Sequence, residues 1–446
     1  MKKLVFNPYG LIDENATKYK ANFHSHSCQN RVMTEQVSIT PVDSEGNSVI
    51  GDFDPADQEY VELTLEAGAI VYRSEKVVDH NGVTLRDSNP NYSHGQNFPY
   101  WIAVNQTNSL NPNSPLGEIH GSDGGFPVDE VVGFYHERNI KILCVAEHDS
   151  CQPTFLPVWP WSKFHIDVDE LGMLPIPGTE WGVGDVEAHH RMTIFKNLLK
   201  ESCNITLEES RILQSNELTV GHWAHVGRYL EDEDNLVYSE QYPLQMYIDS
   251  FIEHNTMQGL EVFNSSNRHY RDIDVWDDIL MELMPMRPVW GFANDDFHGQ
   301  TVGSEFNTVF MDRFDIGSLA KALARGEFTA TTGNSSVEGH QQELHPTLNS
   351  VIINEEEGEI TLNVSNTNTI EWKYNQQVVG SGTTFKYSNN NDIGAYVRAE
   401  LFGNSGRTAL QPFGFIDFET SEEEQAAIVL AETITRQRGA YPQIFP

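Results

Sequence analysis

The stretch that decides the fold is IKILCVAEHD, residues 140–149. Its first seven residues form a nearly continuous apolar run, which is typical of a strand covered on both faces in a parallel sheet. The run ends in Glu147, His148 and Asp149. In parallel barrels the chemistry collects at the carboxyl ends of the strands. The stretch therefore predicts a buried strand that delivers polar side chains to a site.

On both sides of this strand, the chain alternates apolar runs with helical patterns. Pro127 suits the first turn of a helix just before the strand. Expected strands lie at 21–23, 174–176, 192–195, 218–220, 260–263 and 289–292, and expected helices at 244–257, 275–284 and 316–325. Alternation of this kind over about 200 residues predicts a parallel sheet or barrel.

Two flanking segments have a different composition. Residues 35–122 are rich in Asn, Asp, Ser, Gly and Pro, with short alternating runs, and predict an inserted β or irregular subdomain. Alternating runs after residue 345 predict a small antiparallel sandwich. We therefore expect a barrel over 1–34 and 123–340, an insertion over 35–122, a C-terminal β domain over 341–418 and a helical tail over 419–446.

The charge of the chain limits its partners. With 28 Lys and Arg against 65 Asp and Glu, the formal net charge of −37 argues against nucleic acid or an anionic membrane as a partner. The chain shows neither a signal peptide nor an apolar run long enough to span a membrane. We expect a cytoplasmic or virion-associated protein. Self-assembly through the insertion or the C-terminal helix is an open alternative.

Candidate metal ligands begin with His24 and His26, which project from the same side if their segment is extended. Two imidazoles can hold one ion of zinc, iron or copper. One such pair is weak evidence in a chain with 17 His, but other expected strand ends also carry polar side chains. These are Glu147, His148, Asp149, Thr179, Glu180, His222, His225, Glu261, Asn264, Asn294, Asp295, Asp296 and His298. Together they predict a polynuclear metal site.

In this order, the motifs resemble the polymerase and histidinol phosphatase (PHP) superfamily over about residues 20–34 and 122–334. The matching motifs are His24-x-His26, Asp123-Gly124, Glu147-His148-Asp149, Gly178-Thr179-Glu180, His189-His190, Ala224-His225, Leu260-Glu261-Val262-Phe263-Asn264, Asp296-x-His298 and Thr331-Thr332-Gly333-Asn334. The resemblance implies a metal-dependent phosphoesterase with a distorted (βα)7 TIM-like barrel and three divalent ions of zinc, manganese or iron. The tail, at 370–372 and 396–400, resembles an appendage of the carbamate-ester hydrolases.

Carried over by position, the resemblance implies three groups of ligands. The first is His24, His26, Glu180 and Asp296; the second is Asp123, His148 and His298; the third is Glu180, His225 and His190, with His189 as an alternative to His190. The chain departs from the family pattern at Glu147, where Asp is usual, and at Val226, where Pro is usual. It also places residues 27–122 between His26 and Asp123, where the family has only a few residues.

The expected reaction is attack on a phosphate monoester or diester by a metal-bridging hydroxide at His24, His26, Glu180 and Asp296. The cations expected to bind the substrate are Arg191, Arg228, Arg268 and His269, although each could equally pair with a surface carboxylate. Glu147 and His222 are expected to support the ligands, His222 by orienting His225. Two alternatives remain: a carbamate or carboxylic ester hydrolase at the same metals, and a structural protein such as a virion component.

Overall fold

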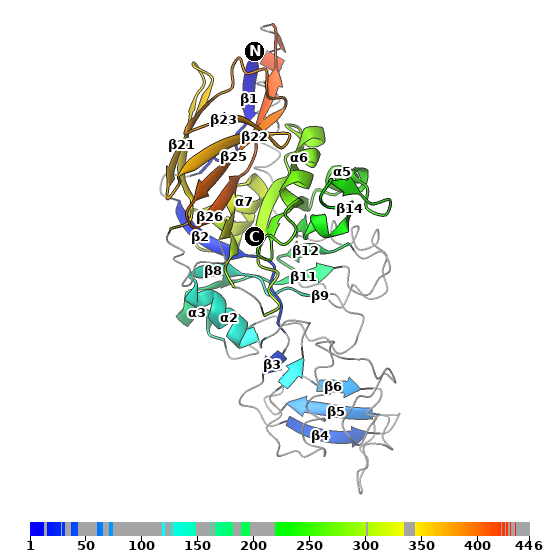
Figure 1. The fold of residues 1–446 in the computed structure, drawn as a ribbon. Helices are drawn as coiled ribbons and strands as arrows, with labels where there is room; N and C mark the ends of the chain where they lie inside the picture. Colours follow the sequence, from blue (N-terminus) through cyan, green and yellow to red (C-terminus); the bar gives the residue numbers. More distant parts are fainter. Residues whose placement is uncertain are drawn as a thin grey trace.

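The computed structural model describes residues 1–12, 16–27, 29–31, 37–42, 60–65, 71–74, 118–120, 126, 128–148, 161, 166–181, 189–196, 219–299, 302–333, 344–420, 422–423, 425–426, 429 and 433. Over these residues the fold is mixed α/β, with many strands and few helices (Figure 1). None of the described helices is long and apolar enough to cross a membrane.

A six-stranded sheet lies at the centre of the predicted barrel region. Its order is β17 (Trp290–Asn294), β16 (Met257–Asn264), β13 (Val220–Trp223), β12 (Arg191–Ile194), β11 (Gly178–Trp181) and β9 (Glu147–His148). Every residue of β11, β12, β13, β16 and β17 is buried, as expected for strands covered on both faces. The strands of this sheet are therefore internal elements.

The direction of β12 corrects the expectation of a uniformly parallel sheet. β12 runs antiparallel to both β11 and β13, whereas the β9–β11, β13–β16 and β16–β17 pairs are parallel. Residues 182–190 alone connect β11 to β12, and a parallel crossover needs about a dozen residues or more. The short connection therefore favours a reversal of the chain.

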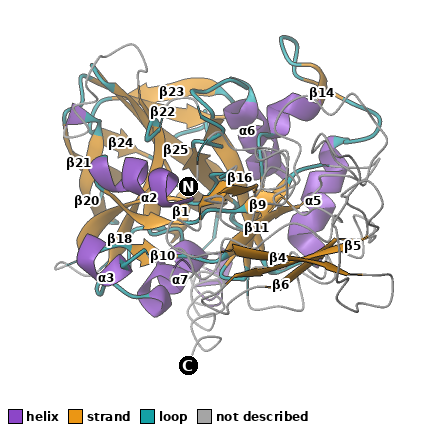
Figure 2. Cartoon of the chain, turned by 90° about the horizontal axis from the view of Figure 1, so that it is seen from below, coloured by secondary structure: helices purple, strands orange, loops and turns teal. Residues whose placement is uncertain are grey.

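The helices that flank the strands are α2 (Val128–Glu137), α3 (Val168–Leu171), α5 (Leu244–Glu253), α6 (Asp272–Leu283) and α7 (Ile316–Arg325). Of these, α5, α6 and α7 lie close to the expected residues and α2 begins just after Pro127, whereas α3 was not expected. α7 matches its prediction because Asp315 caps its first turn and Gly326, with φ 74°, ends it. Figure 2 shows α5 and α3 on opposite sides of the strands.

A second, eleven-stranded sheet crosses the predicted domain boundary at residues 340/341. Its main path is β1 (Lys2–Phe6), β27 (Phe413–Asp417), β25 (Tyr396–Gly403), β26 (Gly406–Leu410), β19 (Phe328–Gly333), β18 (Glu305–Met311), β2 (Thr17–Asn22), β8 (Ile140–Leu143) and β10 (Leu174–Pro175). β22 (Thr369–Tyr374) pairs with β25 and with β23 (Gln377–Ser381). The β19–β26 ladder makes the sheet continuous between the two regions.

A third sheet packs against the C-terminal strands. It consists of β20 (Thr347–Asn354), β21 (Glu359–Ser365) and β24 (Thr384–Lys386). Leu348, Ile360 and Phe385 from this sheet share one apolar core with Trp372 and Val397 of the eleven-stranded sheet. The strands expected in this region are therefore confirmed; β21, β22 and β24 bury mainly one side, whereas β25 is buried on both sides.

The described strands of residues 35–122 form a sheet of their own. It contains β4 (Val37–Val42), β5 (Tyr60–Leu65) and β6 (Val71–Ser74), and it lies at the end of the molecule away from the C-terminal strands (Figure 1). Beside it, β3 (Gln29–Arg31) pairs with β7 (Glu118–His120), which brings the two ends of the excursion together. The β character expected of the insertion is confirmed for these strands.

Candidate metal centre

Backbone contacts just after β2 and β17, two strands from different sheets, position the first candidate ligands. After β2 and β17, Ser25 and Phe297 form an isolated parallel bridge. The Asp296 amide donates to the His24 carbonyl at 3.0 Å, and the His26 amide donates to the Phe297 carbonyl at 3.1 Å. These backbone bonds hold both histidines beside Asp296, although about 270 residues separate them in the sequence.

Four buried donor atoms converge at this junction. His24 Nε2 lies 3.2 Å from Glu180 Oε2 and 3.2 Å from Asp296 Oδ1, and His26 Nε2 lies 3.1 Å and 3.3 Å from the same oxygens. The two imidazole nitrogens are 3.0 Å apart. Ligands of a tetrahedral zinc ion, at about 2.0–2.1 Å from the metal, lie about 3.3 Å from each other. The donor set therefore fits a four-coordinate divalent ion.

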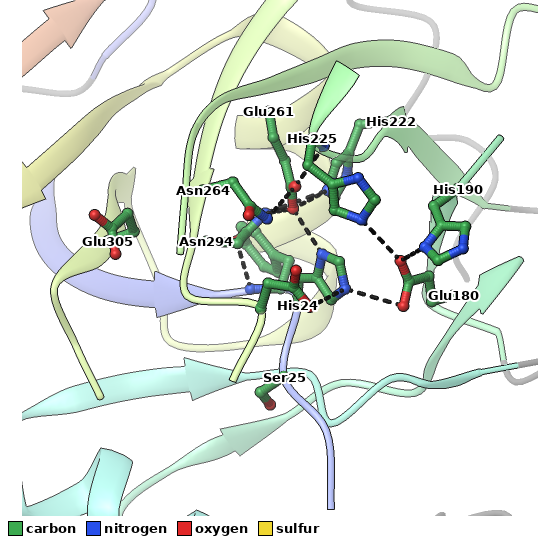
Figure 3. Close-up of polar contacts among 12 residues, drawn as sticks. His24, Ser25, Glu180, His190, His222, His225, Glu261, Asn264, Asn294 and Glu305 are labelled. Atoms are coloured by element: carbon green, nitrogen blue, oxygen red, sulfur yellow. Dashed lines mark hydrogen bonds and ion pairs between the residues drawn. The ribbon is translucent and has the colours of Figure 1, made fainter. Parts of the chain in front are cut away.

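Glu180 faces a second group with its other oxygen. Glu180 Oε1 lies 2.7 Å from His190 Nδ1 and 3.4 Å from His225 Nε2, as Figure 3 shows. These three side chains also form a group that could hold an ion. One carboxylate thus lies between two candidate cation sites, with one oxygen directed at each.

The structure also separates His190 from His189. His189 is fully buried, with Nε2 at 2.6 Å from the Tyr247 hydroxyl and Nδ1 at 3.0 Å from the His190 carbonyl. A carbonyl only accepts, so Nδ1 carries the proton and Nε2 accepts from the tyrosine. Burial holds the pKa of His189 well below its usual value. Both nitrogens of His189 are therefore engaged, and His190 is the one that faces Glu180.

The second predicted ligand group is described only in part. His298 lies beside His26 with ring centroids 4.4 Å apart and the rings tilted by 41°, and its Nδ1 lies 3.3 Å from Asp296 Oδ1. Asp123 lies outside the described residues, and for Glu147 and His148 only the backbone of β9 is described. Of this group, His298 is the member whose side chain the structure places at the cluster.

Glu261, on β16, holds two of the candidate ligand residues in position through contacts with His24 and His225, a role that the sequence did not reveal. Its Oε1 lies 2.8 Å from His24 Nδ1, and its Oε2 accepts from the His225 amide at 3.0 Å. The side-chain amides of Asn264 and Asn294 donate to it at 2.7 Å and 2.9 Å (Figure 3). A carboxylate behind a ligand histidine orients the ring and raises its basicity. The sequence signal that could have indicated this role was a carboxylate with apolar neighbours, Leu260 and Val262, in a buried strand.

The electrostatics of the cluster favour a bound cation. Burial favours neutral His24, but Glu180, Asp296 and Glu261 outweigh it and raise the pKa of His24 well above its usual value. Burial likewise opposes ionisation of Glu261 and Asp296, but mainly the charge on His24 holds the pKa of both carboxyls well below the usual range. The carboxylates thus require a positive charge, which either a proton on His24 or a metal ion supplies.

Two residues of the cluster have an unusual backbone conformation. His225 has φ 33° and Asp296 has φ 49°, both in the left-handed region that residues other than glycine rarely adopt. Such conformations cost on the order of 1–3 kcal/mol and tend to occur at functional sites. Here the conformation of His225 directs its side chain to Glu180, and that of Asp296 directs its side chain to His24 and His26.

Among the predicted substrate-binding cations, Arg268 lies closest to the cluster. Its Nη2 is 3.7 Å from Asp296 Oδ2, and its side chain is 52% exposed. His269 Nδ1 lies 3.6 Å from Glu233 Oε2, and burial lowers the pKa of its imidazole. Arg228 is exposed and lies over the Tyr229 ring.

Arg191 and His222 differ from their predicted roles. Arg191 is buried and packs over Trp181 and Trp223, because neighbouring residues of a strand point to opposite faces and His190 already faces Glu180. His222 stacks on Phe292 and lies 3.6 Å from Glu261. Its link to His225 therefore runs through Glu261, which accepts from the His225 amide.

Comparison with known proteins found solved structures of low similarity. No protein-family model and no curated protein matches the chain. One matching structure is a two-domain Bacteroides vulgatus protein containing a predicted PHP-like metal-dependent phosphoesterase, with 13% identity, coverage of 92% of this chain and 90% of that chain, and a TM-score of 0.40. Another, named as an inferred metal-dependent phosphoesterase of Bifidobacterium adolescentis, has 14% identity, coverage of 46% and 92%, and a TM-score of 0.27. At these scores, the function proposed below depends on the site itself.

Proposed function

We propose that the chain is a metal-dependent hydrolase, and specifically a phosphoesterase that cleaves a small phosphate monoester or diester on a distorted (βα)7 barrel. The observation that carries the proposal is the position of Glu180. Its Oε2 lies within 3.2 Å of His24 and His26, and its Oε1 lies 2.7 Å from His190. Paired ions with shared ligands are the arrangement by which phosphatases and nucleases stabilise both the attacking and the leaving oxygen.

Each described side chain has a role in this proposal. When bound, divalent ions lower the pKa of a coordinated water toward neutrality and neutralise charge that develops on a phosphoryl oxygen. His24 and His26 supply neutral nitrogen ligands, and Glu180 and Asp296 balance the charge of the ions. Glu261 keeps His24 in position through Nδ1, at 2.8 Å. We propose three ions of zinc, manganese or iron, with Asp123, His148 and His298 completing the set.

Arg268 is the candidate that receives the substrate. Its half-exposed guanidinium lies beside Asp296, and guanidinium groups bind phosphate oxygens in a bidentate manner. On a chain with net charge −37, a local cation is needed to attract an anionic ester toward the ions. This position at the cluster favours a phosphate ester over an uncharged acyl ester.

Metal content and a substrate panel test the proposal. Elemental analysis of the purified full chain should find about three ions per chain. Hydrolysis of p-nitrophenyl phosphate, bis-p-nitrophenyl phosphate and p-nitrophenyl acetate should be compared with added Mn²⁺ or Zn²⁺. Glu180→Gln should lose metal and phosphatase activity, whereas Glu359→Gln, on the distant strand β21, should keep both. Acyl ester hydrolysis without phosphatase activity would instead support the carbamate or carboxylic ester alternative, and a metal-free, inactive chain would support a structural role.

A further inference from the structure

A second candidate binding site lies on the opposite side of β2 from the apolar core. A cavity of about 340 Å³ opens beside β2, β8 and β18, next to the start of β20. Its lining includes Lys18 and Lys20 from β2, Lys141 from β8, Phe306 and Thr308 from β18, and Pro346. Lys20 is the direct cross-strand partner of Thr308. Alternation along each strand brings these side chains to one face of the sheet.

The charge of this cavity is opposite to that of the chain. Three lysines line it, and none of the lining residues that the structure describes is acidic, although the chain has more than twice as many acidic as basic residues. Lys18 Nζ contacts Asn349 Oδ1 at 2.8 Å, and Lys141 Nζ contacts the Leu171 carbonyl at 3.4 Å. Among the described residues, these two ammonium groups therefore have neutral acceptors as partners.

Other lysines of the chain form ion pairs with carboxylates, as expected in such an acidic protein. Lys2 pairs with Asp417 at 2.9 Å, and Lys373 pairs with Glu371 at 2.7 Å. The charges of Lys18 and Lys141 are not balanced in this way within the described structure. Keeping like charges together without carboxylates is unfavourable unless an anion offsets the repulsion. The cavity thus has the electrostatics of an anion site.

Phe306 and Pro346 give the cavity an apolar part, and the cavity lies at a distance from the metal centre. The Phe306 ring lies 4.3 Å from Lys20 Nζ, and Pro346 lies on the same lining. Lys20 precedes His24 by four residues, which corresponds to about 13 Å along an extended strand. A ligand in this cavity would therefore contact lysines and an aromatic ring without contacting His24.

We propose that this cavity binds a small organic phosphate, with its phosphate group among Lys18, Lys20 and Lys141 and its carbon part against Phe306 and Pro346. Lysine ammonium groups bind phosphate as point charges. A cavity of this size is within the range of small-molecule sites and is too small for a macromolecular polyanion. The site is independent of the proposed hydrolytic reaction.

Phenylphosphonate, which a phosphoesterase cannot hydrolyse, is a suitable probe, with inorganic phosphate as its comparison. The metal-free full chain carrying His24→Ala and Arg268→Gln lacks both a metal ligand and the guanidinium that would receive phosphate at the metal centre, so calorimetric titration in this background reports on the cavity. In that background, phenylphosphonate should bind, and more tightly than inorganic phosphate because of Phe306. Adding Lys20→Gln and Lys141→Gln should weaken binding by about tenfold or more, since each removes a charge-assisted contact. Lys386→Gln, on the distant strand β24, should leave it unchanged.

Thr308→Glu provides a second test if the lysine variants do not fold. It places a carboxylate directly opposite Lys20 on the neighbouring strand and should abolish binding. Binding that is absent up to 10 mM phenylphosphonate, or that is unchanged in the folded lysine variants or in Thr308→Glu, would refute the proposal. Equal affinity for inorganic phosphate would refute the apolar part of the site. None of these outcomes bears on the metal centre, which His24→Ala and Arg268→Gln have already disabled.

Discussion

Two buried clusters of charged side chains lie on either side of the central strands, and they differ in how their charges are balanced. In the first, Glu180 and Asp296 face His24 and His26. In the second, Asp277 of α6 meets Arg398 of β25 through two hydrogen bonds of 2.7 Å, and Arg398 Nη1 donates to Glu400 at 2.6 Å. We refer to Asp277, Arg398 and Glu400 as the arginine clamp.

The difference between these clusters indicates which of them needs a ligand. The guanidinium of Arg398 neutralises carboxylates of the clamp, and Asp277 and Glu400 raise the pKa of Arg398 further despite the opposing effect of burial. Arg407 Nη1 also lies 3.4 Å from Glu400 Oε2, so two guanidinium groups face the two carboxylates. Together with Arg407, the clamp is therefore electrostatically complete, and it joins the helical region to the C-terminal strands. At the metal centre, a proton on His24, whose pKa the carboxylates raise, supplies one positive charge against Glu180, Asp296 and Glu261. A divalent cation would balance that cluster more fully.

The largest expected effect is that of Glu180→Gln on activity. Loss of the shared carboxylate should reduce kcat/KM for the best phosphate ester by about 10³-fold or more, or about 4 kcal/mol of transition-state stabilisation. In the presence of chelator, the melting temperatures of Glu180→Gln and the wild type should differ little, because glutamine has nearly the same size as glutamate and carries no charge that needs a cation. Calorimetry with and without chelator measures the second quantity. A variant that retained both ions would contradict the bridging position of Glu180.

Arg398→Met should lower stability and leave activity per folded chain unchanged, the reverse of the effect expected for Glu180→Gln. Removing the guanidinium leaves Asp277 buried without a cationic partner and should lower the free energy of unfolding by about 3 kcal/mol. Activity per folded chain and metal content should stay near those of the wild type. The double variant Asp277→Asn/Arg398→Met should recover much of the lost stability in urea unfolding. If Arg398→Met alone left the free energy of unfolding unchanged, the arginine clamp would not be a stabilising element of the fold.

Glu261→Gln tests a residue that supports the centre without facing the cation directly. Loss of the carboxylate behind His24 Nδ1 should weaken metal affinity by about 10- to 100-fold. Added Zn²⁺ or Mn²⁺ should restore most of the activity, which it should not do for Glu180→Gln. Metal titration followed by activity measures both. Failure of excess metal to rescue Glu261→Gln would indicate a role beyond orientation of His24.

The smallest expected effect is the dependence of the clamp on pH. Burial raises the pKa of Glu400, but Arg398 and Arg407 outweigh it and lower that pKa in the folded protein. Its stabilising contribution is therefore present above the unfolded pKa and is lost as pH falls through the lower, folded value. Glu400→Gln should lose less stability than the wild type when urea unfolding at pH 6 is compared with pH 3. An identical loss in both proteins would argue against this contribution.

Several features of the site could be predicted from short stretches of sequence. The spacing of His24 and His26 was enough to place them on one side, because side chains alternate along an extended chain. Apolar runs that end in polar residues located β16 and β17, and the ends of α7 followed from Asp315 and Gly326. These signals are local, so each depends on only a few neighbouring residues.

Other features depended on contacts between distant segments. The choice of His190 over His189 depends on the Tyr247 hydroxyl, and the role of Glu261 depends on its distance from His24. The reversed direction of β12 and the ladder between β19 and β26 arise from strand pairing, which no local pattern encodes. Likewise, the burial of Arg191 follows from which face of β12 the fold directs to Glu180.

Local periodicity and residue chemistry were therefore sufficient to indicate an α/β protein and the kinds of side chain at its site. The backbone bridge between Ser25 and Phe297 brings His24 and His26 to Asp296, and pairing within the six-stranded sheet brings Glu180 between His24 and His225. Such pairings join segments far apart in the chain, and their geometry depends on the packing of the whole sheet. The family resemblance already implied that Glu180 belongs to two ligand groups, but only the tertiary structure determined which of its oxygens faces each group.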